Sequence, residues 1–140
     1  GVLGSHTLLV HCTMSEPEDL AIVAQSGASI VLCPASNLHI TGRLPDVPGM
    51  LSAGVKLLIG SDSLASTPTL DLLHQAAILR RAFPNVPPQT WVDALTTSAA
   101  RALGLAAEAF GELEIDAPSI EALLDGTSWP RRWISAPEAP

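Results

Sequence analysis

Short apolar runs recur along the first half of the chain and are separated by segments with a helical pattern. The runs at residues 8–12, 29–33 and 56–60 are too short for stable helices and are bounded by glycine or polar residues, which is typical of buried strands. A helix is predicted over residues 16–26, with Ser15 as its N-cap and Gly27 at its end. Because strand–helix–strand units close as right-handed crossovers, these strands are expected to run parallel.

The rest of the chain is expected to add helices and a small C-terminal unit. Residues 35–48 have no clear period and predict a long loop, and a short helix over residues 47–53 follows. Longer helices are predicted over residues 69–81 and 89–103, the second one bent near Ser98. Short strands at residues 110–115 and 131–134 flank a helical turn at 119–124. We therefore expect an α/β body over residues 1–105 and an appendage over residues 106–140.

Two metal-capable side chains stand where predicted strands end. His11 ends the first run and Asp62 follows the third, and chemistry collects at the carboxyl ends of parallel strands in α/β sheets and barrels. Side chains alternate along a strand, so Asp62 is expected on the same face as Gly60, with free space beneath it. Two purely structural interpretations stay open: His11 as a structural histidine at a strand end, and Asp62 as the cap of the next helix.

Composition narrows the class of partner. The net charge is −7 and only 7 of the 140 residues are Lys or Arg, too few for a surface that binds nucleic-acid phosphates. No apolar run approaches the roughly 20 residues of a membrane span. Cys12 and Cys33 stand in or beside predicted strands without a Cys-x-x-Cys motif, which indicates reduced core residues and a cytoplasmic protein. The chain begins with Gly1 and soon enters a strand, so we expect a piece of a longer protein.

Several sequence stretches, taken together in their order and spacing, resemble a known family. They are Leu-Val-His-Cys at residues 9–12, Leu-Cys-Pro-Ala-Ser-Asn-Leu at 32–38, the segment from Pro45 to Gly54, Ile-Gly-Ser-Asp-Ser-Leu-Ala-Ser at 59–66, and residues 96–105. From about Leu8 to Leu105, the chain resembles the metal-dependent amidohydrolases of the cytosine deaminase-like and chlorohydrolase-like branch. Within that family it is most similar to deaminases of purine-type nucleosides, such as adenosylhomocysteine or aminodeoxyfutalosine deaminase.

The resemblance implies a fold and a set of site residues. The fold is an α/β, partial (βα)8 TIM barrel with about strands six to eight and their helices, followed by a short part of the family's small β domain. His11, at the end of strand six, is implied to be a catalytic residue beside the metal, and Asp62, at the end of strand eight, a metal ligand and proton shuttle. Asn37 is implied to contact substrate from the loop after strand seven, and His39 is a second substrate-binding candidate. Zinc is the expected divalent metal, with iron as the alternative.

The implied reaction is hydrolysis of a non-peptide C–N bond by metal-bound hydroxide, in which a small heteroaromatic amine of the purine-nucleoside type is deaminated. The family's other metal ligands, a His-x-His pair on strand one and a histidine on strand five, have no counterpart here. This piece alone is therefore expected to be inactive and to bind metal weakly. The alternative is a truncated, non-catalytic remnant or half-barrel that acts only by packing with a partner, either a missing N-terminal half or another copy in a homo-oligomer.

Overall fold

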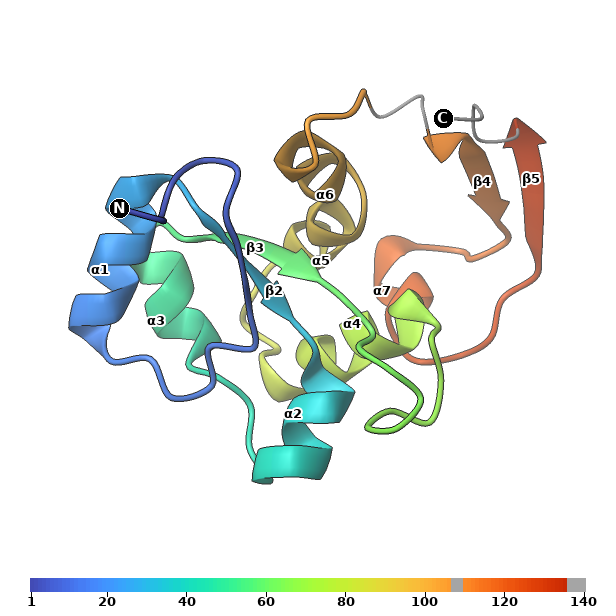
Figure 1. Ribbon diagram of the computed structural model, residues 1–140. Coiled ribbons are helices and arrows are strands. Elements are labelled where there is room, and N and C mark those ends of the chain that lie inside the picture. Colours follow the sequence, from blue (N-terminus) through green and yellow to red (C-terminus); the bar gives the residue numbers. More distant parts are fainter. Residues whose placement is uncertain (107–109, 136–140) are drawn as a thin grey trace.

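A parallel sheet lies at the centre of the computed structural model, which describes residues 1–106 and 110–135 (Figure 1). Its strands are β1 (Leu8–Val10), β2 (Ser29–Leu32) and β3 (Lys56–Ile59), in the order β1-β2-β3. Strand β2 pairs in parallel with both neighbours, with Val31 opposite Leu58 in the pair with β3. The prediction that these strands run parallel is confirmed. Strand β1 is an edge strand, so its alternate side chains are exposed rather than buried.

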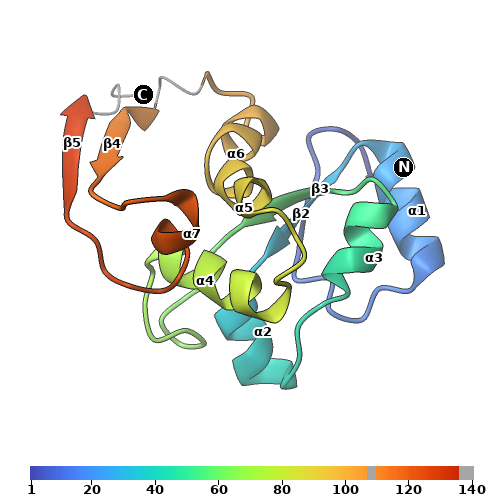
Figure 2. The same ribbon diagram turned by 180° about the vertical axis from the view of Figure 1, so that it is seen from behind.

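Helices connect the strands and cover the sheet. They are α1 (Pro17–Ser26), α2 (Pro34–Thr41), α3 (Val47–Ser52), α4 (Leu72–Ala82), α5 (Pro88–Leu95) and α6 (Thr97–Ala102). Helices α4, α5 and α6 pack against β3, α3 packs against α1, and α2 contacts α4. Seen from behind, α3, α4 and α5 lie on the near side of the sheet (Figure 2). None of the helices that the structure describes is both long and apolar enough to cross a membrane.

Helix α1 follows its predicted course except at its cap. Pro17 occupies the first turn, where its fixed φ suits a helix and its missing N–H is not needed. The N-cap is therefore Glu16, not Ser15 as predicted, and the Glu16 backbone N–H donates a hydrogen bond to Asp19 Oδ2 at 3.0 Å. Gly27 ends the helix in a left-handed conformation, with φ 76°, as expected of a glycine there.

The predicted loop over residues 35–48 is wrong in its first half, which forms α2. Pro34 stands in the first turn, the Asn37 N–H donates to the Cys33 carbonyl at 2.9 Å, and Gly42 ends the helix with φ 70°. Asn37 therefore lies on a helix and not on a loop. The segment is short and rich in small polar residues, so its own sequence carries only a weak helical pattern.

The later helices differ from their predicted bounds at their ends. Helix α4 begins at Leu72 rather than near Thr69, because the Asp71 carboxylate accepts the Leu73 N–H at 3.0 Å and so caps the helix there. Helices α5 and α6 are separated at Thr96, whose φ of −124° and ψ of −96° are not helical. The predicted bend therefore exists, slightly before Ser98.

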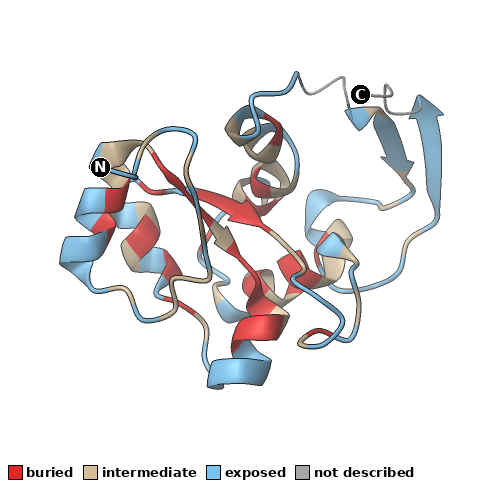
Figure 3. Cartoon of the chain, in the orientation of Figure 1, coloured by how far each residue is buried: buried red, intermediate tan, exposed pale blue. Residues whose placement is uncertain are grey.

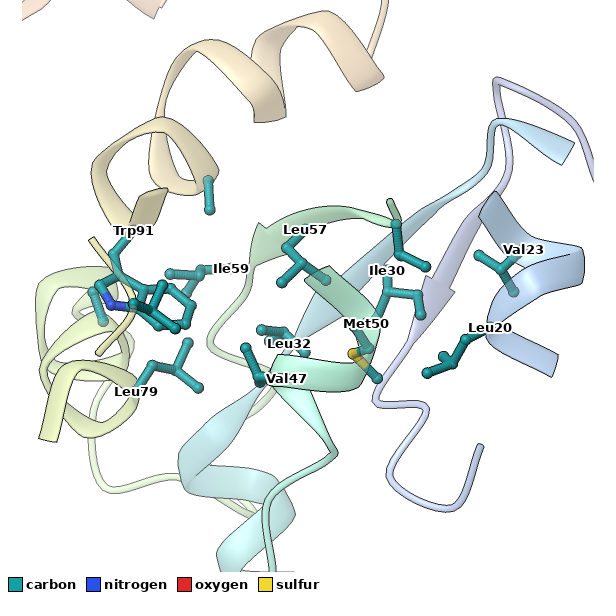
Figure 4. Close-up of a cluster of buried hydrophobic side chains, with 14 of the residues drawn as sticks. Leu20, Val23, Ile30, Leu32, Val47, Met50, Leu57, Ile59, Leu79 and Trp91 are labelled. Atoms are coloured by element: carbon teal, nitrogen blue, oxygen red, sulfur yellow. The ribbon is translucent and has the colours of Figure 1, made fainter. Parts of the chain in front are cut away.

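The hydrophobic core lies between the sheet and the helices that cover it (Figures 3 and 4). Ile30 and Leu32, on the central strand, are 0% exposed. Leu79 and Trp91 bring α4 and α5 against the end of β3 (Figure 4). The apolar residues predicted for the strands thus form one continuous cluster, in which the central strand is buried most completely.

The C-terminal segment forms an antiparallel hairpin that is tied to the body. Strands β4 (Glu112–Ile115) and β5 (Arg131–Ser135) pair with each other, and α7 (Ile120–Leu123) lies between them in the sequence. The strand residues are largely exposed (Figure 3). Leu124 is nevertheless 0% exposed and belongs to the main core cluster. Arg131 also pairs with Asp71, at 2.5 Å, next to the start of α4. Arg81 of α4 donates to the Asp125 carbonyl at 2.6 Å, so a buried leucine, an ion pair and a hydrogen bond anchor the appendage.

The central position of β2 predicts how stability responds to a small deletion. Ile30→Val removes one methyl group from a fully buried position and should lower the free energy of unfolding by about 0.5–1.5 kcal/mol. Ile22→Val removes the same group from α1, where Ile22 is 56% exposed, and should change stability by less than about 0.5 kcal/mol. Urea denaturation of the protein measures both, and equal losses would contradict this description of the core.

Candidate active site

The candidate site lies where β1 and β3 end. His11 directly follows β1, and Asp62 lies in the segment after β3. His11 Nε2 and Asp62 Oδ2 are 3.7 Å apart, and the two side chains are 41% and 34% exposed. That separation is too long for a hydrogen bond but short enough for one small group to contact both atoms. The prediction that these two side chains meet at one end of the sheet is confirmed.

The backbone at this site has an unusual conformation. His11, Cys12 and Asp62 have φ values of 71°, 49° and 62°, and they are the non-glycine residues with positive φ in the described parts of the chain. Left-handed conformations are uncommon for residues with a side chain and gather at functional sites, where surrounding contacts hold them. The His11 N–H donates to the Val31 carbonyl at 3.0 Å, so the sheet itself holds the first of these residues.

The expected free space beneath Asp62 is absent. A Cβ atom placed on Gly60 would lie 3.0 Å from Val31 Cγ1 and 3.3 Å from Cys33 Sγ. Side chains of the neighbouring strand therefore fill the region that the sequence interpretation left open. Gly60 serves the close approach of β2 and β3, and the left-handed turn at Asp62 interrupts the simple alternation that the prediction assumed.

Hydrogen bonds hold the Asp62 carboxylate and stabilise its charge. The Ser36 hydroxyl donates to Oδ2 at 2.6 Å, the Ser63 N–H donates to Oδ1 at 2.8 Å, and the Ser66 hydroxyl donates to Oδ2 at 3.2 Å. These bonds lower the pKa of Asp62, with the Ser36 bond as the largest cause. Because α4 is capped by Asp71, the alternative interpretation of Asp62 as the cap of the next helix is wrong.

Sequence reasoning missed Ser36, although a signal for it exists. Ser36 follows the end of β2 closely, and β2 lies between the strands that carry His11 and Asp62. A polar residue just beyond a middle strand must lie near those beyond its neighbours, so this position was a candidate from topology alone. The side chain is 1% exposed and gives its hydroxyl to Asp62.

Asn37 reaches the same pocket from α2. It is 2% exposed, its Nδ2 donates to Thr13 Oγ1, and its buried Oδ1 has no hydrogen-bond partner among the described residues. A buried acceptor without a partner is costly in a folded protein and calls for an explanation. A ligand in the pocket that donates a hydrogen bond to Asn37 would supply one.

The pocket between these residues has an open volume of about 660 Å³. His11, Asp62 and Asn37 line it together with the apolar side chains of Met14 and Ile40. His39 is exposed and lines a separate hollow of about 290 Å³ beside residues 64–68. The structure thus brings together all the predicted site residues except His39.

The cysteines beside the site are protected from ionisation. Cys12 and Cys33 are free. Burial, together with the nearby Asp62 charge, raises the pKa of the Cys33 thiol to about 11. Burial also raises the pKa of Cys12. A neutral thiol is a poor nucleophile, so neither cysteine is suited to nucleophilic attack at this site.

The residues present fit part of a metal site. A carboxylate offers about four acceptor positions, and hydrogen bonds to Asp62 fill only part of them, so Oδ1 keeps capacity for a cation. The imidazole of His11 lies near this carboxylate and is a second kind of metal ligand. Within residues 1–106 and 110–135, no group of three or more His, Cys, Asp or Glu side chains could hold a metal ion. A complete catalytic zinc site needs about three protein ligands.

Comparison with known proteins places this geometry in a family. Residues 1–115 match the model described as the amidohydrolase family. The chain belongs to the amidohydrolase family. It is 36% identical to an aminodeoxyfutalosine deaminase of Deinococcus radiodurans, over 74% of this chain and 25% of that protein. It is 33% identical to a 5-methylthioadenosine/S-adenosylhomocysteine deaminase of Halobacterium salinarum, over 89% of this chain and 30% of that protein. This amidohydrolase chain thus spans about a quarter of the length of such relatives.

Solved structures agree with the family. An adenosine deaminase from Xanthomonas campestris, with bound zinc, superposes with a TM-score of 0.66 and 32% identity, over 74% of this chain and 25% of that one. The aminofutalosine deaminase of Helicobacter pylori gives a TM-score of 0.66 and 27% identity, over 71% of this chain and 26% of that one. The predicted resemblance to amidohydrolases, and to nucleoside deaminases among them, is confirmed.

The hydrogen bond from Ser36 predicts how Asp62 titrates. Ser36→Ala should raise the pKa of Asp62 towards its ordinary value of 3.8, because the largest stabilisation of the carboxylate is lost. A depressed carboxyl pKa adds stability above the unfolded value, which is lost as the pH falls through the folded pKa. In Ser36→Ala this contribution should therefore be smaller, and its loss on acidification should be complete at a higher pH than in the wild type. NMR titration of the Asp62 carboxyl carbon in metal-free protein measures the change.

Ser66→Ala is the matched control, because its longer bond to the same oxygen contributes less. It should raise the Asp62 pKa by a smaller amount. A larger rise in Ser66→Ala than in Ser36→Ala would show that Ser36 is not the main support of the charge.

Proposed function

We propose that the complete protein containing this chain is a metal-dependent amidohydrolase that deaminates a small purine-type nucleoside. The observation that carries the proposal is the convergence of His11 and Asp62, from the ends of parallel strands, on one pocket. Deaminases of nucleosides among the relatives support the substrate class. In this proposal the chain supplies about strands six to eight of a (βα)8 barrel, residues 1–105, and part of a small β domain, residues 106–140.

Zinc is the metal we infer, with iron as the alternative. Support comes from the Xanthomonas campestris adenosine deaminase, which was solved with zinc bound. Asp62 would hold the metal and His11 would lie beside it, while the remaining ligands would come from parts of the protein outside this chain. When bound, the metal acts as a Lewis acid that lowers the pKa of water.

In the proposed reaction Asp62 transfers the proton, and His11 stabilises the negative charge that develops on oxygen. The reaction joins water to the ring carbon and releases the exocyclic amine as ammonia. Asp62 takes a proton from the attacking water and returns it to the leaving nitrogen. His11 donates a hydrogen bond to the oxygen that develops negative charge, an interaction worth on the order of 3 kcal/mol of barrier when the donor is preorganised. An aspartate with an ordinary pKa of 3.8 is ionised at neutral pH, and the pKa of Asp62 is lower still, so Asp62 begins the cycle as a proton acceptor.

The pocket has the size and polarity that a nucleoside requires. Its volume of about 660 Å³ lies within the roughly 300–1,000 Å³ common for small-molecule sites. Met14 and Ile40 supply apolar walls, and the unpartnered Oδ1 of Asn37 can accept a hydrogen bond from a substrate hydroxyl or amine. Asn37 is therefore the substrate-binding residue that the geometry supports best, and His39 remains a prediction from the sequence.

The alternative function, a non-catalytic unit that acts by packing with a partner, has one feature in its favour. Edge strand β1 exposes Leu8 and Val10, at 37% and 52%, beside backbone groups that β2 does not pair. Such an edge invites pairing with another strand. That strand could belong to the N-terminal part of the same protein or to another copy in a homo-oligomer.

A cytoplasmic location is inferred from the free cysteines.

Substitutions at the two convergent residues test catalysis. In the complete protein, Asp62→Asn should lower turnover by at least about 10²-fold, because it removes a base and a negative metal ligand while keeping the shape. His11→Asn should also lower turnover but leave the metal content nearly unchanged, because His11 lies beside the metal. The measurements are ammonia release from 5-methylthioadenosine and S-adenosylhomocysteine, and metal stoichiometry by elemental analysis.

Ile22→Val is the control for these assays, because it changes an exposed side chain of α1. Near-normal turnover in Asp62→Asn with metal bound would remove Asp62 from the catalytic site. A complete protein that neither holds metal nor releases ammonia from any purine nucleoside would favour the non-catalytic alternative.

The orphan acceptor of Asn37 predicts an effect on substrate binding. Asn37→Ala should raise KM about tenfold, the equivalent of one hydrogen bond of about 1.4 kcal/mol, with a smaller change in kcat. His39→Ala is the comparison variant, since His39 lies in the neighbouring hollow. Steady-state kinetics that show a rise in KM for His39→Ala but not for Asn37→Ala would reverse this assignment.

A further inference from the structure

We infer that Gln75 is a positioning residue, which holds Ser36 against Asp62 from a buried site on α4. The inference rests on the proposed role of Asp62 and goes beyond it, because Gln75 is not among the residues that line the pocket. Gln75 therefore does not touch a ligand there. It acts through the two segments that carry the polar groups of the site.

The Gln75 side chain is 0% exposed and makes two hydrogen bonds across the structure. Its Oε1 accepts the Ala35 backbone N–H at 3.0 Å, and its Nε2 donates to Thr67 Oγ1 at 3.0 Å. A backbone N–H can only donate, so the amide oxygen must face Ala35 and the amide nitrogen must face Thr67. One amide group thus joins the start of α2 to the segment after β3.

At the first of these contacts, Gln75 caps helix α2. The first N–H groups of a helix have no partner within the helix. Cys33 occupies the N-cap position without a side-chain hydrogen bond, and Pro34 has no N–H to offer. Ala35 therefore has the first N–H of α2 that needs an acceptor, and Gln75 supplies it. The residue held in this way is the immediate neighbour of Ser36.

At the second contact, Gln75 anchors the segment after β3, which contains Asp62, to helix α4. Thr67 is 5% exposed, its hydroxyl donates to the Thr69 carbonyl at 3.0 Å, and its N–H donates to the Ser63 carbonyl at 3.1 Å. The turn from Ser63 to Thr67 is thus closed by its own backbone and attached to α4 through one hydroxyl. Ser63 is the residue whose N–H holds Asp62 Oδ1.

The two anchored segments meet at the 2.6 Å hydrogen bond between Ser36 and Asp62. Without Gln75, Ala35 and Thr67 would each lose a buried partner, and both segments could move apart. Misplacement of a catalytic group by about 1 Å can reduce turnover by about 10²-fold. Gln75 thus sets the distance between the hydroxyl and the carboxylate that it supports.

A double-mutant cycle in the complete protein tests this coupling. Gln75→Met keeps the length of the side chain and removes both hydrogen bonds. It should lower kcat at least about tenfold in the wild-type background. In a Ser36→Ala background the same substitution should lower kcat by less than about threefold, because the contact it protects is already absent. Equal effects in both backgrounds would overturn the inference.

Leu79→Ala is the matched control, because Leu79 lies on the same helix, is 0% exposed and packs in the core (Figure 4). It should lower the melting temperature at least as much as Gln75→Met does, and leave kcat measured below that temperature nearly unchanged. A loss of kcat in Leu79→Ala equal to that in Gln75→Met would show that both effects are general destabilisation.

Amide hydrogen exchange gives a readout that does not need activity. In Gln75→Met, exchange should accelerate at Ala35 and in residues 63–67, and in Leu79→Ala it should accelerate in α4 and not selectively at those sites. Unchanged exchange at Ala35 in Gln75→Met would overturn the inference. If the wild-type protein releases no ammonia, the proposed function fails, while the exchange data still decide whether Gln75 holds these segments.

Discussion

The pairing of β2 with β1 on one side and β3 on the other determines which side chains can meet. Its hydrogen bonds continue beyond the regular strands: the His11 N–H donates to the Val31 carbonyl, and the Gly60 N–H donates to the Leu32 carbonyl. The hydrogen bonds between the strands therefore fix the backbone position as far as the candidate site. Parallel strands end on the same side, so a histidine and an aspartate from distant parts of the sequence arrive within 3.7 Å of each other.

The backbone of the candidate site is more strained than that of the sheet. Left-handed backbone at His11, Cys12 and Asp62 costs of order 1–3 kcal/mol at each residue. The hydrogen bonds to Asp62 from three serines offset part of that cost, because they form only when the turn holds the carboxylate in this position. The serine-rich segment after β3 thus stabilises a backbone turn and a charge at the same place.

Local patterns were sufficient for the strands, for the end of α1 at Gly27 and for the meeting of His11 with Asp62. They were insufficient where a contact joins distant residues. Helix α2 is capped by Gln75, 40 residues further on, and Ser36 donates to Asp62 across 26 residues, so neither feature leaves a local signal. The shift from loop to helix also separates Asn37 from His39, because positions two apart on a helix point about 200° apart around its axis.

The left-handed turn at Asp62 also bears on how the family can diverge. Asparagine and glycine adopt this conformation at least as readily as aspartate does. A single substitution at this position can therefore remove the carboxylate without forcing the backbone to refold. Under the role proposed for Asp62, a relative that keeps the sheet, the core and the pocket but lacks catalysis is thus only one mutation away, and the residue at this turn, rather than the overall structure, would identify it.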